Sequence, residues 1–235
     1  MIYLFDIDGT LTPSRLRIDL EFEQFFLNWM GDKDVIFVTG SDKEKTIEQV
    51  GEKIWTRASR IYQSCGNAVY QGGQLIQKNH FDLTPELKKL LLEFVMLSDW
   101  PKQFSNHIEE RIGLINFSTI GRDCPQEDRN AYYSWDKKNK ERESICKKIE
   151  KMFPELEASV GGEISIDIYP KGQNKAQVID DLEGHIVFFG DKCEPGGNDY
   201  PIVERLEREW EAGNRDRTIH RVKNYNETWN ILKHS

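Results

Sequence analysis

Two aspartates stand one residue apart near the start of this 235-residue chain. Asp6 and Asp8 follow an apolar run at residues 1–5 and directly precede a Gly-Thr pair. In such a pair one carboxylate can attack a phosphorus atom and carry the phosphoryl group, while the other moves a proton to or from the oxygen that leaves or attacks. Because an Asp-x-Asp beside glycine also occurs in ordinary turns, the chemical interpretation needs support from elsewhere in the chain.

Further polar side chains follow two other apolar runs. Thr39 and Ser41 come at the end of one run, and Asp191 ends another. In open α/β sheets, ligands bind at the carboxyl ends of the strands, so the fold would bring these residues and the aspartate pair to one edge. Carboxylates that meet there repel one another, and a divalent cation relieves the repulsion. Ligation by oxygen alone suits Mg²⁺.

Two kinds of side chain could stabilise a phosphoryl group at this edge. The hydroxyl of Thr39 or Ser41 could donate a hydrogen bond to the phosphoryl oxygens, and Lys175, near the start of the helical stretch 174–182, could neutralise them. Taken alone, Lys175 is typical of a solvated helix residue and Asp191 of a loop cap. The order and spacing of the whole set favour the chemical role.

The elements that must position these residues alternate between strand and helix. Apolar runs at 1–5, 35–40 and 186–191 predict buried parallel strands, and the patterns at 18–30 and 41–54 predict helices. This alternation is typical of an α/β fold with a parallel sheet.

The middle of the chain has a different pattern. Residues 113–122 and 163–172 alternate in part between apolar and polar, which predicts an antiparallel sheet with one open face. The charged stretch at about 126–153 predicts helix. We therefore expect an α+β unit inserted between two parts of the α/β domain. The predicted ranges are 82–171 for the insert and 1–81 with 172–235 for the core.

Composition limits the partners that we expect. A formal net charge of −8 disfavours a nucleic-acid surface. The longest apolar runs are short and no basic segment precedes an apolar one, so we expect no membrane span and no signal peptide. The four cysteines are far apart without paired spacing, which favours a cytoplasmic protein with reduced thiols over a zinc or disulfide protein. An acidic protein that binds an anionic substrate must gather its arginines locally.

Four segments, in their order along the chain, resemble the four motifs of the haloacid dehalogenase superfamily of phosphotransferases: FDIDGTLT, VTGSD, the lysine of NKAQ, and FFGDKCEPGGND. The resemblance implies a Rossmann-like core with an inserted cap domain. It also implies that Asp6 is the nucleophile and Asp8 the general acid/base. Mg²⁺ would be held by Asp6, the backbone carbonyl of Asp8 and Asp191. Asn198 and Asp199 match the supporting residues around the metal.

The insert resembles the cap of one family in that superfamily, the eukaryotic-type phosphomannomutases. The similar segments are GLINFSTIGRDCPQEDRNAYYSWDKK and GGEISIDIYPKGQNK, and GDKCEPGGND in the core also matches. The resemblance covers nearly the whole chain. It implies that arginines of the cap bind the distal phosphate of a sugar phosphate, and that a serine and an aspartate on one cap strand contact sugar hydroxyls. The matching residues are Arg15, Arg111, Arg122, Arg129, Ser165 and Asp167.

The residues themselves agree with this assignment. Ser165 and Asp167 are two positions apart and would share one face of a strand. Guanidinium groups fit phosphate oxygens in a bidentate way. Arg111 and Arg129 also stand among acidic neighbours, a pattern that is typical of surface ion pairs. The family pattern favours phosphate binding.

The resemblance implies a Mg²⁺-dependent phosphohexomutase that interconverts mannose 6-phosphate and mannose 1-phosphate. A hexose 1,6-bisphosphate would be its activator, and two copies would form a homodimer through the cap. The alternative is a sugar-phosphate phosphatase, in which water accepts the phosphoryl group. The cap arginines favour the mutase. Thr39, where the family has glycine, and the divergent segment 204–218 favour the phosphatase. That segment also yields no residues for a second cation.

A third hypothesis belongs to another class: a binding or scaffolding protein that keeps the fold without catalysis. The presence of the nucleophile, the acid/base, the lysine and the metal aspartate argues against it.

Overall fold

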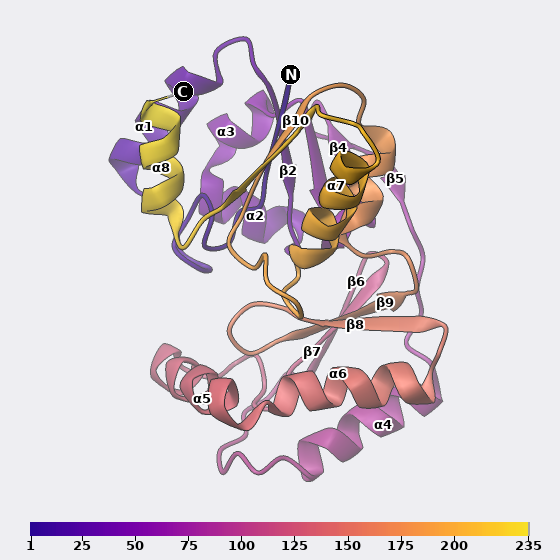
Figure 1. The fold of residues 1–235 in the computed structure, drawn as a ribbon. Coiled ribbons are helices and arrows are strands. Elements are labelled where there is room, and N and C mark those ends of the chain that lie inside the picture. Colours follow the sequence, from indigo (N-terminus) through magenta and orange to yellow (C-terminus); the bar gives the residue numbers. More distant parts are fainter. Residues whose placement is uncertain (235) are drawn as a thin grey trace. The chain divides into compact units, whose positions relative to one another are not determined.

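The computed structural model describes residues 1–234, which divide into two compact units (Figure 1). The first, here called the core unit, comprises Met1–Lys78 and the chain from Asn174 onward. The second, the cap unit, is Asn79–Gln173. The sequence places the insert at about 82–171. Among the helices of residues 1–234, none combines the length and apolar character needed to cross a bilayer.

The core unit is built on a seven-stranded sheet with the order β11-β10-β1-β2-β3-β4-β5. The pairs from β11 to β3 are parallel, whereas β4 and β5 join as antiparallel strands. The strands are β1 (Ile2–Phe5), β2 (Asp34–Val38), β3 (Arg60–Gln63), β4 (Ala68–Gln71), β5 (Gln74–Lys78), β10 (Ile186–Gly190) and β11 (Arg217–Arg221). Because β1 lies between β2 and β10, the residues that follow these three strands meet at one edge.

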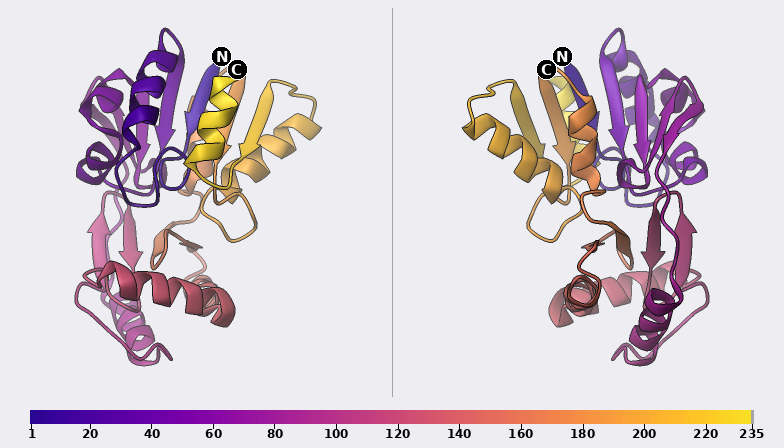
Figure 2. Two further views of the ribbon diagram at one scale, coloured as in Figure 1. Left: turned by 90° about the vertical axis from the view of Figure 1, so that its left-hand side faces the viewer. Right: turned by 90° about the vertical axis from the view of Figure 1, so that its right-hand side faces the viewer.

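Helices cover both faces of the core sheet (Figures 1 and 2). One face packs against α1 (Leu20–Met30), α2 (Lys43–Val50), α3 (Glu52–Arg57) and α8 (Tyr225–Lys233). The other packs against the 3₁₀ helix η2 (Lys175–Asp181) and α7 (Tyr200–Glu211). A second short 3₁₀ helix, η1 (Ser64–Gly66), follows β3. The central strands β1, β2 and β10 are mostly apolar and buried, because helices cover both faces of the sheet there.

Two predicted helices of the core differ in detail from the observed ones. The pattern at 18–30 gives a helix that begins at Leu20, where the Asp19 carboxylate caps two backbone N–H groups. The pattern at 41–54 gives two helices, α2 and α3, because Gly51 with φ 80° ends the first.

The cap unit contains an antiparallel four-stranded sheet with the order β6-β7-β9-β8. Its elements are α4 (Pro85–Met96), β6 (Ile108–Arg111), β7 (Leu114–Phe117), α5 (Gln126–Asn139), α6 (Glu141–Met152), β8 (Leu156–Val160) and β9 (Ile166–Pro170). One face of the sheet packs against α4 and α6, and α5 packs in a separate cluster around Tyr132. The predicted helix at 126–153 is therefore two helices, divided at Lys140, which has the left-handed φ of 56°.

Candidate active site

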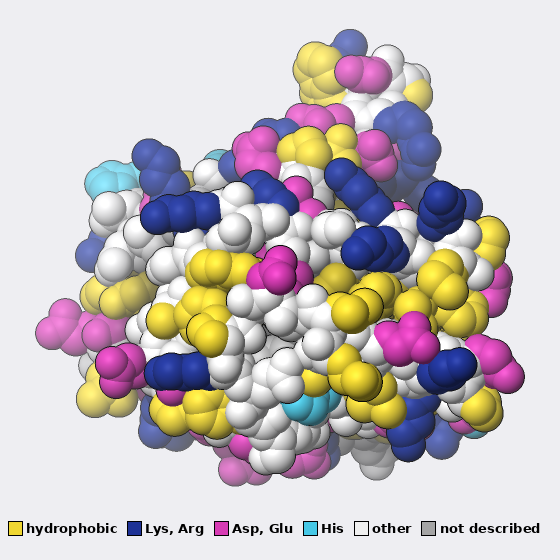
Figure 3. Space-filling model, turned by 90° about the horizontal axis from the view of Figure 1, so that it is seen from below, with side chains coloured by type: hydrophobic (Ala, Val, Ile, Leu, Met, Phe, Trp, Pro, Cys, Tyr) yellow, Lys and Arg dark blue, Asp and Glu magenta, His cyan; other side chains and the backbone are white. Residues whose placement is uncertain are grey.

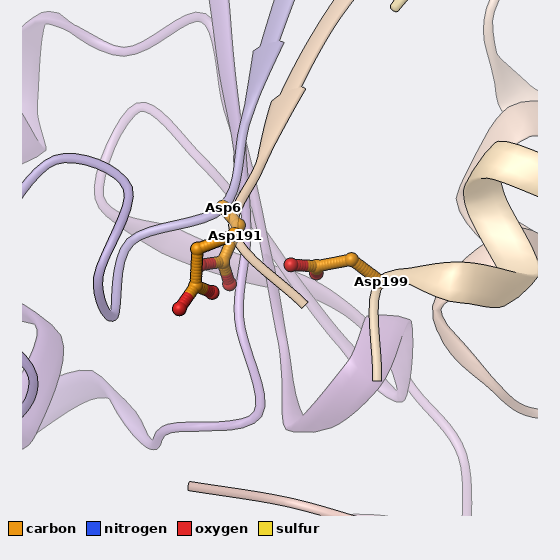
Figure 4. Close-up of side chains that lie close together, drawn as sticks. All are labelled: Asp6, Asp191 and Asp199. Atoms are coloured by element: carbon orange, nitrogen blue, oxygen red, sulfur yellow. The ribbon is translucent and has the colours of Figure 1, made fainter. Parts of the chain in front are cut away.

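Three carboxylates from distant parts of the chain converge in the core unit (Figure 4). Asp6 directly follows β1, Asp191 directly follows β10, and Asp199 directly precedes α7. One oxygen of each lies within 4.8 Å of the others. The parallel pairing of β1 with β10 brings the first two together, because both strands end at the same edge.

Lys175 connects two of these carboxylates. Its Nζ donates to Asp6 Oδ1 at 2.6 Å and to Asp199 Oδ1 at 2.7 Å. The lysine side chain is only 1% exposed, so it is not a solvated helix residue. Burial lowers the pKa of Lys175, but the charges of Asp199 and Asp6 outweigh burial and raise this pKa above its usual value. The lysine is therefore a fixed positive charge inside the cluster.

Asp6 and Asp191 hold protons more tightly than ordinary aspartates. Burial raises the pKa of Asp6 well above its usual value, and the charge of Asp199 adds to this while Lys175 opposes it. Burial also raises the pKa of Asp191 to about 6, with Lys192 opposing. Lys192 contacts two of these carboxylates. Its ammonium group lies 2.8 Å from Asp191 Oδ2, and the backbone N–H of Lys192 donates to Asp199 Oδ2 at 3.0 Å. The sequence analysis missed Lys192, although it directly follows Asp191.

The cluster fits a divalent cation. All donor atoms are oxygen, and Asp191 Oδ1 is buried without a hydrogen-bond partner among the described residues. Gly9 leaves the necessary room, because a Cβ built there would lie 2.4 Å from Asp191 Oδ2. Its φ of +87° is also one that glycine adopts most easily. Asn198 lies in the same loop, one residue before Asp199, and is half-buried.

Asp8 is held by a separate set of donors. Its Oδ1 accepts the backbone N–H of Arg15 at 2.6 Å and the amide of Gln49 at 2.9 Å, and Ser41 Oγ lies 3.5 Å from its Oδ2. The structure thus brings Arg15 to the site through its backbone, at a positive φ of 60°. Gln49 is fully buried on α2 and was missed, because nothing in the sequence distinguishes a buried glutamine from an exposed one.

Thr39 lies at the end of β2, next to β1. Its side chain is buried and its hydroxyl accepts the backbone N–H of Ser41 at 3.1 Å. The predicted core residues therefore form two neighbouring groups. One joins the nucleophile candidate to the lysine and the carboxylates that could hold a metal ion, and the other surrounds Asp8.

In the cap unit, four polar residues lie opposite one another across the sheet. The register pairs Glu109 with Asn116, Asn116 with Asp167, and Asp167 with Ser159. Directly paired residues share a face of the sheet, so the four side chains form one polar row. Asn116 Nδ2 donates to Asp167 Oδ1 at 2.5 Å.

Arginines join this row. Glu109 Oε1 lies 2.8 Å from Arg111 Nε, and its Oε2 forms an ion pair with Arg122 Nε. Arg122 Nη1 donates to Asn116 Oδ1 and, at 3.2 Å, to Ser165 Oγ. The Arg111 and Arg122 side chains are 10% and 9% exposed, so these ion pairs are not ordinary surface pairs.

Arg129 completes the network from α5. It is buried, and its Nη2 donates to the backbone carbonyl of Arg122 at 3.1 Å. The structure thus gathers all five predicted cap residues in one network. Glu109 and Asn116 belong to it as well and were not predicted. Their register becomes visible only when the strands are paired.

Comparisons with known proteins agree along most of the chain. A family model described as eukaryotic phosphomannomutase matches residues 22–233. The phosphomannomutase of Drosophila melanogaster is 38% identical over 217 residues, which cover 86% of this chain and 85% of that one. Phosphomannomutase 1 of Homo sapiens is 35% identical over 216 residues, which cover 86% of this chain and 82% of that one. That of Saccharomyces cerevisiae is 33% identical over 213 residues, covering 86% and 84%.

Solved structures establish the fold. A haloacid dehalogenase-like hydrolase from Bacteroides thetaiotaomicron matches with a TM-score of 0.63 at 11% identity, covering 99% of this chain and 98% of that one. The C-terminal domain of a trehalose-6-phosphate phosphatase from C. albicans matches with a TM-score of 0.65 at 15% identity, covering 99% and 90%. The predicted haloacid dehalogenase-like α/β fold, with its separate antiparallel sheet, is confirmed.

Proposed function

Because the chain belongs to the eukaryotic phosphomannomutase family, we propose that it interconverts mannose 6-phosphate and mannose 1-phosphate. Membership makes it a phosphoryl-transfer enzyme of the mutase type. The observation that carries the proposal is the setting of Asp6, a buried carboxylate hydrogen-bonded to Lys175 within an all-oxygen cluster. Such a carboxylate is placed to accept a phosphoryl group while the lysine neutralises its charge.

The reaction has two mirrored halves. Phospho-Asp6 transfers its phosphoryl group to the free hydroxyl of a bound hexose monophosphate. The Asp6–phosphorus bond breaks, the sugar–phosphorus bond forms, and Asp8 accepts the hydroxyl proton. The resulting hexose 1,6-bisphosphate then returns its other phosphate to Asp6, while Asp8 gives the proton to the departing sugar oxygen. A hexose 1,6-bisphosphate would also phosphorylate Asp6 at the start and act as activator.

The residues around Asp6 divide the remaining work. Asp6, Asp191 and the backbone carbonyl of Asp8 would hold Mg²⁺, with Asn198 and Asp199 in support. When bound, the cation would offset the clustered negative charge and favour the ionised form of Asp6. Lys175 orients the Asp6 carboxylate through its 2.6 Å hydrogen bond.

The hydroxyls of Thr39 and Ser41 would donate hydrogen bonds to the phosphoryl oxygens. They follow β2, the neighbour of β1 in the sheet, as such a role requires.

The cap network would hold the other end of the substrate. Arg111, Arg122 and Arg129 would bind the phosphate that is not reacting, and Ser165 and Asp167 would contact sugar hydroxyls. Arg122 already donates to Ser165 Oγ, so the two parts of this site are connected. The side chain of Arg15, half-buried after the first motif, would add another positive charge for the substrate.

A sugar-phosphate phosphatase is the second candidate. Thr39 and the segment 204–218 depart from the family pattern, and phosphatases are among the solved structures with this fold. The chemistry up to phospho-Asp6 is the same, and only the acceptor differs. A phosphatase has no need for a second phosphate site, so the buried arginine network favours the mutase.

The fate of the phosphoryl group separates the two. We would follow mannose 1-phosphate by ³¹P NMR with Mg²⁺ and catalytic glucose 1,6-bisphosphate. Appearance of mannose 6-phosphate supports the mutase. Inorganic phosphate without mannose 6-phosphate would contradict it and establish the phosphatase.

A cytoplasmic location and a homodimer through the cap also stay predictions of the family resemblance. Leu92, Met96 and Leu97, at the outer side and end of α4, are exposed by 44%, 81% and 77%. Figure 3 shows hydrophobic side chains beside Lys and Arg on the face seen from below. Burial of Leu92, Met96 and Leu97 would stabilise a dimer. Sedimentation analysis of the chain and of Met96→Asp tests the dimer prediction. The variant should dissociate into monomers at a higher protein concentration than the unchanged chain.

A further inference from the structure

The Glu109 carboxylate forms ion pairs with two of the cap arginines. Its two carboxylate oxygens each take one guanidinium, Oε1 that of Arg111 and Oε2 that of Arg122, and in both cases the contact is to Nε. Its side chain is 27% exposed, against 10% and 9% for the arginines. The Glu109 side chain is therefore more accessible to solvent than the two nearly buried arginines with which it pairs.

The network is close to neutral with Glu109 in place. Among the contacts given above, the ionisable side chains are three arginines, Glu109 and Asp167, and the charges of these five groups sum to +1. Asn116 connects Asp167 to Arg122, since it donates to the aspartate and accepts from the arginine. Loss of the Glu109 charge would raise the net charge of the five groups to +2.

We infer that Glu109 limits the affinity of the cap arginines for phosphate. This inference rests on the proposed function, in which these arginines bind the phosphate that is not reacting. A phosphate dianion at this network meets the repulsion of Glu109, and it must compete for guanidinium groups that already have an ionic partner. A mutase gains from such a limit, because the bisphosphate must leave the arginines in order to exchange its two phosphates.

An opposite role for Glu109 would be to orient the guanidinium groups. In that case its removal would weaken phosphate binding. Charge should dominate, because the arginines have further partners that hold them: Arg122 also bonds Asn116 and Ser165. The electrostatic effect acts at short range on a doubly charged ligand in a partly desolvated site, where it is stronger than in water.

The test measures binding without turnover. We would titrate mannose 1-phosphate by calorimetry into the full chain carrying Asp6→Asn, alone and combined with Glu109→Gln, Glu109→Ser or Glu109→Asp. Both charge-removing variants should bind about tenfold more tightly, a difference of about 1.4 kcal/mol. Glu109→Asp keeps the charge and should bind less tightly than either. Glu110→Gln is the matched control, because Glu110 is adjacent and exposed.

Each outcome has one meaning. Equal or weaker binding by folded Glu109→Gln or Glu109→Ser overturns the inference, and the use of two variants guards against misfolding of one. Arg122→Met in the same Asp6→Asn chain tests the underlying proposal. If Arg122→Met does not weaken binding, the arginine site itself is wrong. If it does, and the Glu109 variants do not bind more tightly, only the role of Glu109 is wrong.

Discussion

The core and the cap each contain a buried cluster of charged side chains, and the two clusters have opposite excess charge. In the core, three carboxylates surround Lys175, with Lys192 at the edge. In the cap, Glu109 pairs with Arg111 and Arg122, and the same network includes Arg129 and Asp167. The excess negative charge of the core cluster would attract a cation, and the excess positive charge of the cap cluster would attract an anion. Each contains two built-in counter-charges, Lys175 and Lys192 in the core and Glu109 and Asp167 in the cap, that offset its excess only in part.

The clusters also differ in how the fold assembles them. The core carboxylates come from strand and helix ends, where Asp6 and Asp191 are fixed by the pairing of β1 with β10. The cap side chains project from the face of one antiparallel sheet, where the register places Glu109, Asn116 and Asp167 side by side. The core site therefore depends on where elements end, and the cap site depends on which residues are opposite one another.

From this comparison we expect the largest loss of mutase turnover when Asp6, the proposed nucleophile, is replaced. Asp6→Asn removes the atom that we propose accepts the phosphoryl group, so mutase turnover should fall by about 10⁴-fold or more. Binding of mannose 1-phosphate should persist, because the cap network is intact. The measurement is turnover by ³¹P NMR beside calorimetric binding, with the exposed Asp32→Asn as control. Substantial turnover in Asp6→Asn would show that another group carries the phosphate.

The second effect should come from the space beside the metal-binding carboxylates. Gly9→Ala places a Cβ against Asp191 and imposes a positive φ on alanine, so activity should fall by about a hundredfold, as a displacement of about 1 Å can cause. Gly72→Ala is a matched control, because Gly72 also has a positive φ, +57°, but nothing lies within 4 Å of its Cβ position.

Both glycine variants should lose stability from the backbone strain, by about 1–2 kcal/mol. Only Gly9→Ala should also lose affinity for Mg²⁺, measured as the rise in Tm on adding the ion. An equal loss of activity in the two variants would mean that strain, and not the contact with Asp191, limits the site.

The third effect should separate the two clusters. Arg122→Met removes charge-assisted hydrogen bonds to phosphate worth about 1.5–3 kcal/mol, so KM for mannose 1-phosphate should rise about 10–100-fold. The stabilisation by Mg²⁺ should not change, because the carboxylates proposed to bind the metal are in the other unit. Arg208→Met, on the exposed side of α7, is the control. A weaker Mg²⁺ effect in Arg122→Met would contradict the independence of the two clusters.

How far the sequence predicts each cluster follows from these differences. Asp6 and Asp191 are predictable because each ends an apolar strand, and the edge of a parallel sheet gathers such residues. The apolar runs also predict three of the five parallel strands, β1, β2 and β10, whereas β3 and β11 were not predicted. The resemblance to a known family supplied Asp199, and the structure brings it within 4.8 Å of the other two carboxylates.

Other features depend on long-range pairing that a single sequence does not specify. Glu109 and Asn116 are seven residues apart, and only the β6–β7 register makes them neighbours. Gln49 reaches Asp8 from a helix 41 positions away. The division of the predicted helix at Lys140 was missed because a lysine in the left-handed conformation has no strong signal. The cap arginines were predicted from the family resemblance, since their acidic neighbours alone favoured surface ion pairs.

The smallest predicted effect is a pH dependence of the core cluster. Burial raises the pKa of Asp191 to about 6, with Lys192 opposing and Asp199 adding to the shift. Since this value lies above the ordinary 3.8, the protonated carboxyl stabilises the metal-free fold at low pH. That contribution is lost as the pH rises through about 6.

In the proposed site Mg²⁺ would bind the ionised carboxylates, so protons would compete with it, and its affinity should fall by up to about tenfold per pH unit below that value. The rise in Tm that Mg²⁺ produces should therefore be larger near pH ~7.5 than near pH ~5. In Asp191→Asn, whose side chain cannot titrate, the rise in Tm on adding Mg²⁺ should be small at both pH values. The cap cluster offers the contrast, because its cations are arginines, which stay charged across this range. Phosphate binding by the cap should therefore follow the second ionisation of the phosphate and not that of Asp191. If the Mg²⁺ effect were the same at both pH values, the three carboxylates would not be the groups that bind the metal.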